Sequence, residues 1–244
     1  MPIEEKLSLG KTLGRTIRKT VDITDTTLDQ GLERSLESVF MNKDRRKIFE
    51  YLCKKPCAHL RQIARDIGMT PPSAKWHLVK IQDRGFIYSN EIGGHLVFYP
   101  RRLIQKEAVP FFSYLSREKT GALLRLIVMR PGITQRELAD ELGRNPQSVS
   151  KLLGKIKDEG LVNYIKDGRQ KKNFISKRVI EKVGKTPRTR KKFFVEWLME
   201  ELQRDGVRPQ IMNKKDAEVT IKIFDGEKAV PFTIVTQPLS YLLK

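Results

Sequence analysis

The sequence predicts a mainly α-helical α+β fold with small β-hairpins, in which one small domain occurs twice. Three observations support this prediction: an internal repeat at an offset of 75 residues, apolar residues at helical spacing between capping signals, and short strand-forming runs around glycine turns. A chain of 244 residues is long enough for one large domain or for two to three small ones with their own cores. The repeat favours small domains.

The internal repeat runs without a gap from helix to helix. Between residues 56 and 85, 11 of 30 positions carry the same residue as the position 75 residues later, against about one in twenty by chance. Apolar positions also coincide, as with Ile63 and Leu138. The identical pairs are Pro56/Pro131, Arg61/Arg136, Ala64/Ala139, Gly68/Gly143, Pro71/Pro146, Ser73/Ser148, Leu78/Leu153, Lys80/Lys155, Ile81/Ile156, Asp83/Asp158 and Gly85/Gly160.

The second copy begins with two predicted helices. Residues 119–130 place apolar side chains at helical spacing, and the following Pro-Gly pair ends that helix. Thr134 and Glu137 have the spacing of a capping box, which opens a second, short helix that ends at Gly143.

A third helix and a hairpin complete the second copy. Asn145 is a predicted N-cap and Pro146 suits the first helical position, so a helix runs from there to Gly160. The strand-forming runs LVNYIK and KNFIS then flank Asp167 and Gly168, which predicts a β-hairpin. A helix, a helix-turn-helix and a hairpin in this order form the winged-helix arrangement.

The first copy repeats the same order of elements. Its third helix has Thr70 as N-cap and Pro71 in the first turn, and its hairpin turns at Gly93 and Gly94. We therefore expect a first winged-helix domain over residues 44–102 and a second over residues 119–184.

The helix-turn-helix cores resemble those of a known family. The runs HLRQIARDIGMTPPSAKWHLVKIQDRGFI and ITQRELADELGRNPQSVSKLLGKIKDEGLV are similar to the two cores of archaeal tandem winged-helix transcriptional regulators, relatives of the ArsR and MarR groups. The resemblance covers roughly residues 44–176. It implies the winged-helix fold and DNA binding, but it does not indicate the regulated genes or an effector.

The charge of the chain favours a polyanionic partner. A formal net charge of +19 is too basic for an ordinary metabolic enzyme, so nucleic acid is the leading partner class and an acidic membrane surface is the second. Residues 44–118 carry a net +7 and residues 119–184 a net +8, whereas residues 1–43 are neutral and residues 185–244 carry +4. The positive charge therefore lies mainly on the repeated domain.

The third helix of each copy is the predicted DNA-reading element. Its apolar positions define a buried face, and the remaining positions would meet the major groove, where lysine can contact guanine and glutamine can pair with adenine. Gln147 and Lys151 are the strongest base-reading candidates, and the capped helix N-termini offer backbone N–H groups to phosphates. The predicted contacts are Thr70, Ser73, Lys75, Trp76, His77 and Lys80 in the first copy, and Asn145, Gln147, Ser148, Ser150, Lys151 and Lys155 in the second.

The two predicted wings differ in charge. The second carries Lys166, Arg169, Lys171 and Lys172, which suit phosphate contact or insertion into the minor groove. The first reads EIGGHL and has no lysine or arginine, so we expect the second wing to bind DNA more strongly. An exposed Trp76 would contact a sugar or a thymine methyl group, or it would pack against the neighbouring domain.

Three segments lie outside the repeat. Residues 1–43 form a predicted N-terminal helical arm with an apolar stripe that includes Val39 and Phe40, for dimerisation or for docking on the first domain; its zero net charge disfavours a membrane-surface helix. Residues 103–118 form a predicted linker helix, too apolar for a flexible linker. Residues 185–244 form a predicted helix and β-hairpin unit that begins with the basic run KTPRTRKK, a solvated face or a DNA-backbone clamp.

Metal binding, catalysis and membrane insertion have little support in the sequence. The residues that a metal could use are Cys53, Cys57, His59, His77 and His95, but no CxxC or CxC pair occurs, and no nucleotide-binding or nucleophile motif is present. We expect no enzyme activity, no cofactor and no metal. Two cysteines and no apolar run of about 20 residues favour a cytoplasmic, nucleoid-associated protein.

The sequence leaves three functional hypotheses. The first is a sequence-specific, double-stranded DNA-binding transcriptional regulator, acting as a homodimer and in contact with the transcription machinery. The alternative is a non-specific architectural DNA-binding protein or a winged-helix scaffold of a transcription or replication assembly. RNA binding is a third, weaker hypothesis.

Overall fold

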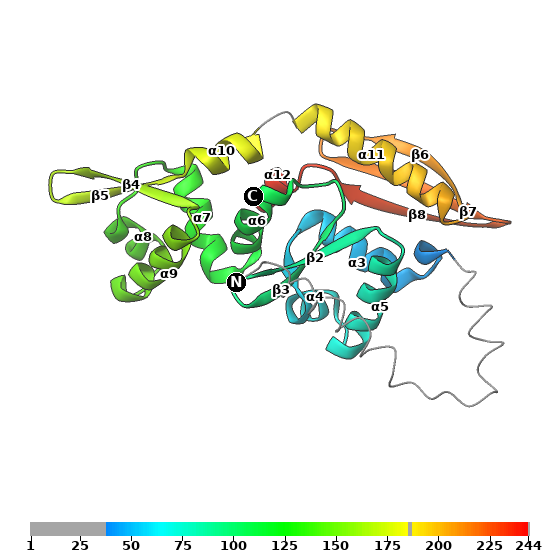
Figure 1. Ribbon diagram of the computed structural model, residues 1–244, viewed down its shortest axis with the longest axis horizontal. Helices are drawn as coiled ribbons and strands as arrows, with labels where there is room; N and C mark the ends of the chain where they lie inside the picture. The colour runs from blue at the N-terminus through cyan, green and yellow to red at the C-terminus, as the bar shows by residue number, and fades with distance from the viewer. Residues whose placement is uncertain (1–37, 185–186, 244) are drawn as a thin grey trace, which may run out of the picture. The chain divides into compact units, whose positions relative to one another are not determined.

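The computed structural model describes residues 38–184 and 187–243, and Figure 1 shows their arrangement. The elements of the first half are η2 (Val39–Met41), α3 (Lys43–Lys54), β1 (Ala58–His59), α4 (Leu60–Ile67), α5 (Pro71–Asp83), β2 (Ile87–Ile92), β3 (His95–Pro100), η3 (Lys106–Ala108) and α6 (Val109–Ser116). Those of the second half are α7 (Glu118–Met129), α8 (Gln135–Glu141), α9 (Pro146–Asp158), β4 (Val162–Asp167), β5 (Gln170–Ile175), α10 (Lys177–Gly184), α11 (Pro187–Arg204), β6 (Arg208–Lys214), β7 (Glu218–Asp225), β8 (Lys228–Val235) and α12 (Pro238–Leu242). Helices with small antiparallel sheets confirm the predicted α+β class.

The first repeat unit, residues 44–102, contains the helices α3, α4 and α5 and the hairpin β2–β3. Gly68 ends α4 in the left-handed conformation at φ 78°, and the Thr70 hydroxyl accepts a hydrogen bond from the Ser73 N–H, so the predicted turn and cap are both present. The sheet has the order β1-β3-β2. The sequence gives no sign of β1, because a strand of two residues, Ala58 and His59, is too short to show a period.

The second repeat unit, residues 119–184, has the same order of helices and hairpin in α7, α8, α9 and β4–β5, followed by α10. The predicted capping box is formed: the Thr134 N–H donates to Glu137 Oε2 at 2.7 Å, and the Glu137 N–H donates to Thr134 Oγ1 at 3.3 Å. An isolated bridge between Thr134 and Lys172 lies where the first unit has β1. Helix positions and caps thus agree between the two units.

The predicted linker helix corresponds to η3 and α6. Phe111, Phe112 and Leu115 of α6 are buried, which agrees with the apolar character of this segment. The next helix begins almost at once, and its Thr120 hydroxyl donates to the Tyr114 carbonyl at 2.6 Å. At Gly121 a Cβ atom would lie only 2.2 Å from the Leu115 carbonyl oxygen. Only glycine allows α6 and α7 to approach this closely.

The described part of the C-terminal segment contains the helices α11 and α12 and three strands, where the sequence predicted one helix and a hairpin. The strands β7 and β8 are the predicted hairpin, and β6 joins them in a sheet of order β6-β7-β8. β6 contains Pro209 and shifts its register between Ile211 and Asn213, so its sequence lacks regular alternation. This segment packs on the first unit: the Phe232 ring lies 5.7 Å from that of Phe40, and the Thr233 N–H donates to Glu50 Oε1 at 2.8 Å.

Most of the predicted N-terminal arm, including its stripe up to residue 37, lies outside the described residues. Val39 and Phe40 were expected at the end of a helical stripe, but they lie in the short helix η2 and are buried. The Ser38 hydroxyl and the Val39 N–H both donate to Asp205 Oδ2 at 2.6 Å, and Arg84 pairs with Asp205 Oδ1 at 2.8 Å. The buried carboxylate of Asp205 therefore joins the end of α11 to η2 and to the end of α5.

We expect Gly121→Ala to lower the free energy of unfolding by about 2 kcal/mol, because the added methyl group would overlap the Leu115 carbonyl. Gly154→Ala is the matched control. It is also a helical glycine, but a Cβ atom added there would have nothing within 4 Å, so the substitution should be neutral or stabilise by up to about 1 kcal/mol. Urea denaturation measures both changes, and equal effects at the two positions would contradict the close approach.

Candidate nucleic-acid interface

The exposed face of α9 carries most of the residues predicted for the second unit. Val149, Leu153 and Ile156 are buried on one side of the helix, and Gln147, Ser148, Ser150, Lys151 and Lys155 are all exposed. At 100° per residue, Gln147 and Lys151 lie opposite the buried side. The Asn145 side chain accepts a hydrogen bond from the Gln147 N–H at 2.8 Å, so it caps the helix. All five side chains are therefore accessible, with Gln147 and Lys151 at the centre of the exposed face.

Helix α5 likewise has one buried and one exposed side in the first unit. Ala74, Leu78 and Ile81 are buried, whereas Ser73, Lys75, Trp76 and Lys80 are exposed. Trp76 is 54% exposed, and its ring contacts are with His77 and with Lys80, whose Nζ lies 5.8 Å from the ring centroid. Within the described part of the chain, Trp76 thus faces solvent rather than packing against a neighbouring domain.

His77 corrects one prediction. It was expected among the outward or flanking residues of the helix, but its side chain is buried, with Nε2 3.9 Å from Asp44 Oδ2. Burial lowers the pKa of His77, the nearby Asp44 carboxylate opposes this effect, and the Arg45 charge adds to it. The repeat register places His77 opposite Leu152, a partly buried position, and this was the available signal for an inward side chain.

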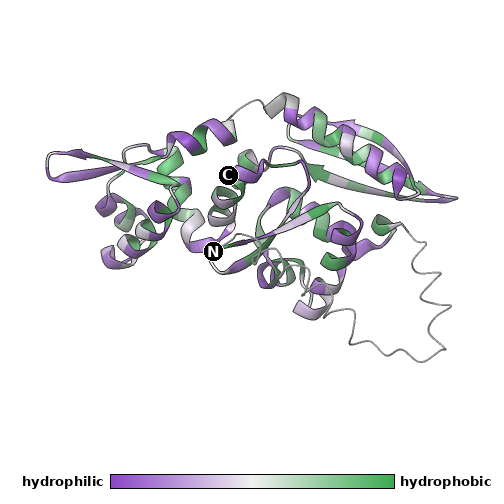
Figure 2. Cartoon of the chain, viewed as in Figure 1, coloured by the Kyte–Doolittle hydropathy of each residue, from purple (hydrophilic) through white to green (hydrophobic). Residues whose placement is uncertain are grey.

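The β4–β5 hairpin is the more basic of the two wings. Its tip turns at Gly168 with φ 58°, Lys166, Arg169 and Lys171 are exposed, and Figure 2 shows the tip coloured as hydrophilic. Lys172 differs from them because its Nζ lies 2.5 Å from Asp167 Oδ2. The hydrogen bond between them lowers the pKa of Asp167 and raises that of Lys172. The pairing with Asp167 therefore partly neutralises the charge of Lys172.

Lys157 and Tyr164 join this basic surface, and the sequence pattern alone did not indicate either of them. Lys157 of α9 and Lys171 of β5 lie over the ring of Tyr164 in β4, at 4.7 and 5.1 Å from its centroid. Burial lowers the pKa of Lys157, and the charge of Lys171 lowers it further. The alternation of LVNYIK places Tyr164 on the same strand face as Val162. Its contact with Lys157 of α9 depends on how the hairpin packs against that helix.

The first wing is held by its own chain. Arg117, which precedes α7, donates to the Ile92 carbonyl at 2.9 Å, and its guanidinium lies 4.6 Å from the Tyr114 ring centroid. A Cβ at Gly93 would be 3.1 Å from the Tyr114 hydroxyl, so the turn lies close to α6. The wing that has no basic residues is thus also the wing that contacts its own chain.

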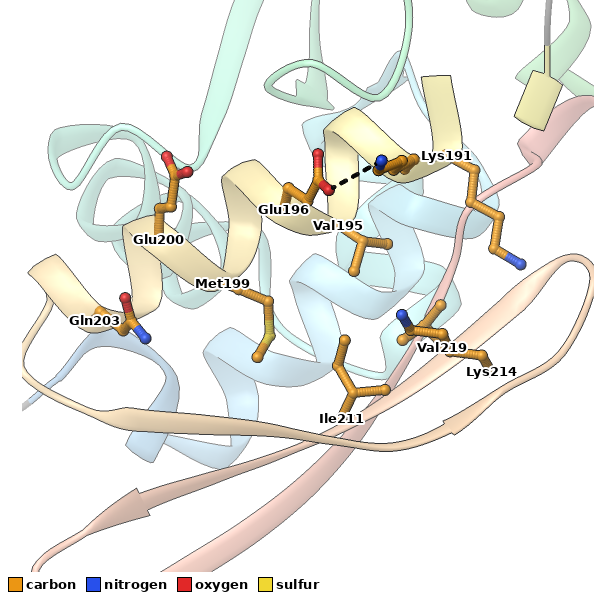
Figure 3. Close-up of a pocket in the computed structure, with 10 residues that line it drawn as sticks. Lys191, Val195, Glu196, Met199, Glu200, Gln203, Ile211, Lys214 and Val219 are labelled. Carbon is orange, nitrogen blue, oxygen red and sulfur yellow. Dashed lines mark ion pairs between the residues drawn. The ribbon is translucent and has the colours of Figure 1, made fainter. Parts of the chain in front are cut away.

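The structure describes the basic segment before the C-terminal sheet only in part. The side chains of Lys185 and Arg188 lie outside what the structure describes. Lys191 Nζ donates to the Asp216 carbonyl at 2.9 Å and so holds the turn between β6 and β7. Figure 3 shows Lys191 beside a cavity of about 490 Å³ between α11 and the sheet, which Val195, Met199 and Ile211 line with apolar atoms. A clamp on DNA by this segment stays a prediction.

The described cysteines and histidines are not grouped as a metal site would require. Cys53 and Cys57 are buried, and burial raises the pKa of both thiols. The rings of His59 and His95 lie 5.8 Å apart. Burial lowers the pKa of His59, and the nearby His95 lowers it further. Among the described residues, no three His, Cys, Asp or Glu side chains are grouped to hold a metal ion. No helix of residues 38–184 and 187–243 is both long and apolar enough to cross a bilayer.

Comparison with known proteins agrees with this geometry. Residues 117–172, which contain the capped helix-turn-helix and most of the β4–β5 hairpin, match the MarR family. The chain is also 25% identical over 145 residues to an uncharacterized HTH-type transcriptional regulator of Methanocaldococcus jannaschii. The match covers 59% of this chain and 36% of that relative, so the chain spans little more than a third of the relative's length. These similarities confirm the predicted resemblance to winged-helix transcriptional regulators of MarR type.

We expect the protein to lose stability as the pH falls below about 6.5. Because the folded-state pKa of His77 lies below the unfolded value, the unfolded chain binds more protons, and the stabilising contribution of the neutral imidazole disappears toward acidic pH. His77→Leu, which installs the residue of the second unit, should remove part of this decrease. His59 has a pKa lowered in the same direction and should account for another part. Urea denaturation between pH 7.5 and 5 measures the slope, and an unchanged slope in His77→Leu would contradict the assignment.

Proposed function

We propose that the protein is a transcriptional regulator that binds double-stranded DNA with sequence specificity through two winged helix-turn-helix domains, residues 44–102 and 119–184. One observation carries the proposal: a capped helix, α9, exposes Gln147 and Lys151 beside a hairpin with three exposed cations. A helix that reads base edges and a wing that contacts the backbone are the two parts that such recognition needs.

In the second domain, α9 enters the major groove. Gln147 pairs with an adenine, and Lys151 contacts the acceptors of a guanine. Ser148, Ser150 and Lys155 flank these two positions and contact bases or phosphates. The wing cations Lys166, Arg169 and Lys171 contact the backbone or the adjacent minor groove, with Lys172 in a weaker role because of its pairing with Asp167.

In the first domain, α5 forms a second contact. Ser73, Lys75, Trp76 and Lys80 face the DNA, and His77 does not take part because it is buried. Thr70 and Asn145 cap their helices with their side chains, so they set the position of the helix N-termini, whose backbone N–H groups can receive a phosphate. With its wing held against α6, the first domain contributes mainly through this helix.

A homodimer on promoter DNA, in the cytoplasm and associated with the nucleoid, completes the proposal. Regulation then follows from occlusion of a promoter or from contact with the transcription machinery. The second candidate is an architectural protein that coats DNA, and the net charge of +19 favours it, because lysines bind the phosphates of any sequence.

Competition binding distinguishes the two candidates. The full chain is incubated with fragmented genomic DNA, and the retained fragments are then challenged with an excess of random duplex DNA at fixed salt. A regulator should retain a small set of fragments about a thousandfold better than random DNA. If random DNA displaces every fragment equally well, the protein is architectural, and if no duplex binds, the proposal fails.

Replacing Lys166, Arg169 and Lys171 together with alanine should weaken DNA binding and reduce its salt dependence. Each phosphate contact contributes about 0.9 to the log–log slope of affinity against salt, so the slope should fall by about 2 to 3. The matched control replaces Lys214, Lys215 and Lys228, three exposed lysines of the C-terminal sheet, with the same loss of net charge. Equal slopes for the two triple variants, measured by fluorescence anisotropy, would show that only overall charge matters.

A further inference from the structure

The exposed face of α5 carries three apolar side chains at positions where α9 has two polar residues and a glycine. In the 75-residue register, Pro72, Trp76 and Val79 of α5 coincide with Gln147, Lys151 and Gly154 of α9. All three residues of α5 are exposed, with Trp76 at 54% and Val79 at 44%. The two helices therefore offer different chemistry at the same positions.

These positions form the centre of the outward face. At 100° per residue, Pro72, Trp76 and Val79 lie within about 40° of the direction opposite the buried side of the helix. Lys75 lies on one flank of this apolar stripe and Lys80 on the other, and both are exposed. The helix thus presents an apolar ridge with a cation along each side.

We propose that this apolar stripe of α5, Pro72, Trp76 and Val79, reads the C5-methyl groups of thymines in the major groove. The thymine methyl is the apolar group that base edges display in that groove, so an apolar ridge gains most from a site that contains thymines. The inference rests on the proposed function. It adds that the two domains read different base chemistry, with methyl groups at α5 and purine hydrogen-bonding groups at α9.

The flanking charges favour DNA over a protein as the partner of the stripe. A helix in the major groove has a phosphate backbone on each side, and Lys75 and Lys80 are placed to meet both. The Thr70 cap presents the N-terminal end of the helix, where base contacts concentrate. An acidic protein surface with apolar groups is the competing partner, and the experiment below separates the two.

The test uses a duplex enriched by the genomic competition experiment, synthesised once with thymine and once with deoxyuridine, which lacks the methyl group. The wild-type chain should bind the thymine duplex more tightly, by about fourfold for each methyl group contacted. The double variant Trp76→Gln, Val79→Thr should lose this preference. Both residues are exposed, so the variant should unfold at the same urea concentration as the wild type.

Lys151→Ala is the control, because it should weaken binding to both duplexes by the same factor and keep the preference for thymine. Equal wild-type affinity for the two duplexes would overturn the inference while leaving the proposed function intact. A thymine preference that survives in the double variant would also overturn it and would favour a protein partner for the stripe. Failure of the wild type to bind any duplex would overturn the proposed function together with the inference.

Discussion

The aromatic contacts of Phe40 hold together segments that are far apart in the sequence. Its ring centroid lies 4.8 Å from that of Phe49 in α3, 4.7 Å from Phe86 after α5 and 5.7 Å from Phe232 in β8. One fully buried side chain thereby joins η2, helix α3, the segment that follows α5 and the C-terminal sheet. Because the core is shared, the position of α5 depends on residues more than 140 positions away, and loss of packing at Phe40 would affect all three segments.

Local signals identified the helices that precede each hairpin of the repeat and three of their caps. They missed α10 and α12, and they missed the elements that depend on distant partners. Thr70, Thr134 and Asn145 identified helix starts correctly, because a cap is formed within three residues of chain. The strand β1 exists only by pairing with Phe98 and Val97 of β3, some 40 residues later. The packing of the C-terminal sheet on α3 has the same cause, since no local pattern specifies which apolar faces meet.

In the candidate site, too, local patterns identified some residues and tertiary contacts determined others. Exposure of Gln147, Lys151 and Lys155 followed from helical periodicity alone. His77 was misplaced because a histidine is compatible with either face, although the repeat register places it opposite the partly buried Leu152. The cluster of two lysines around Tyr164 required knowledge of how the hairpin lies against α9. Side chains that act through tertiary contact are thus the part that periodicity cannot supply.

The irregular strand β6 has a consequence for self-association. An edge strand exposes unpaired main-chain groups that can template another chain. Pro209, the register shift before Asn213 and the exposed Lys214 all make β6 a poor template. At the opposite edge of the sheet, the Thr233 N–H is already bonded to Glu50 of α3. Both edges of the sheet therefore carry features that disfavour the addition of another strand.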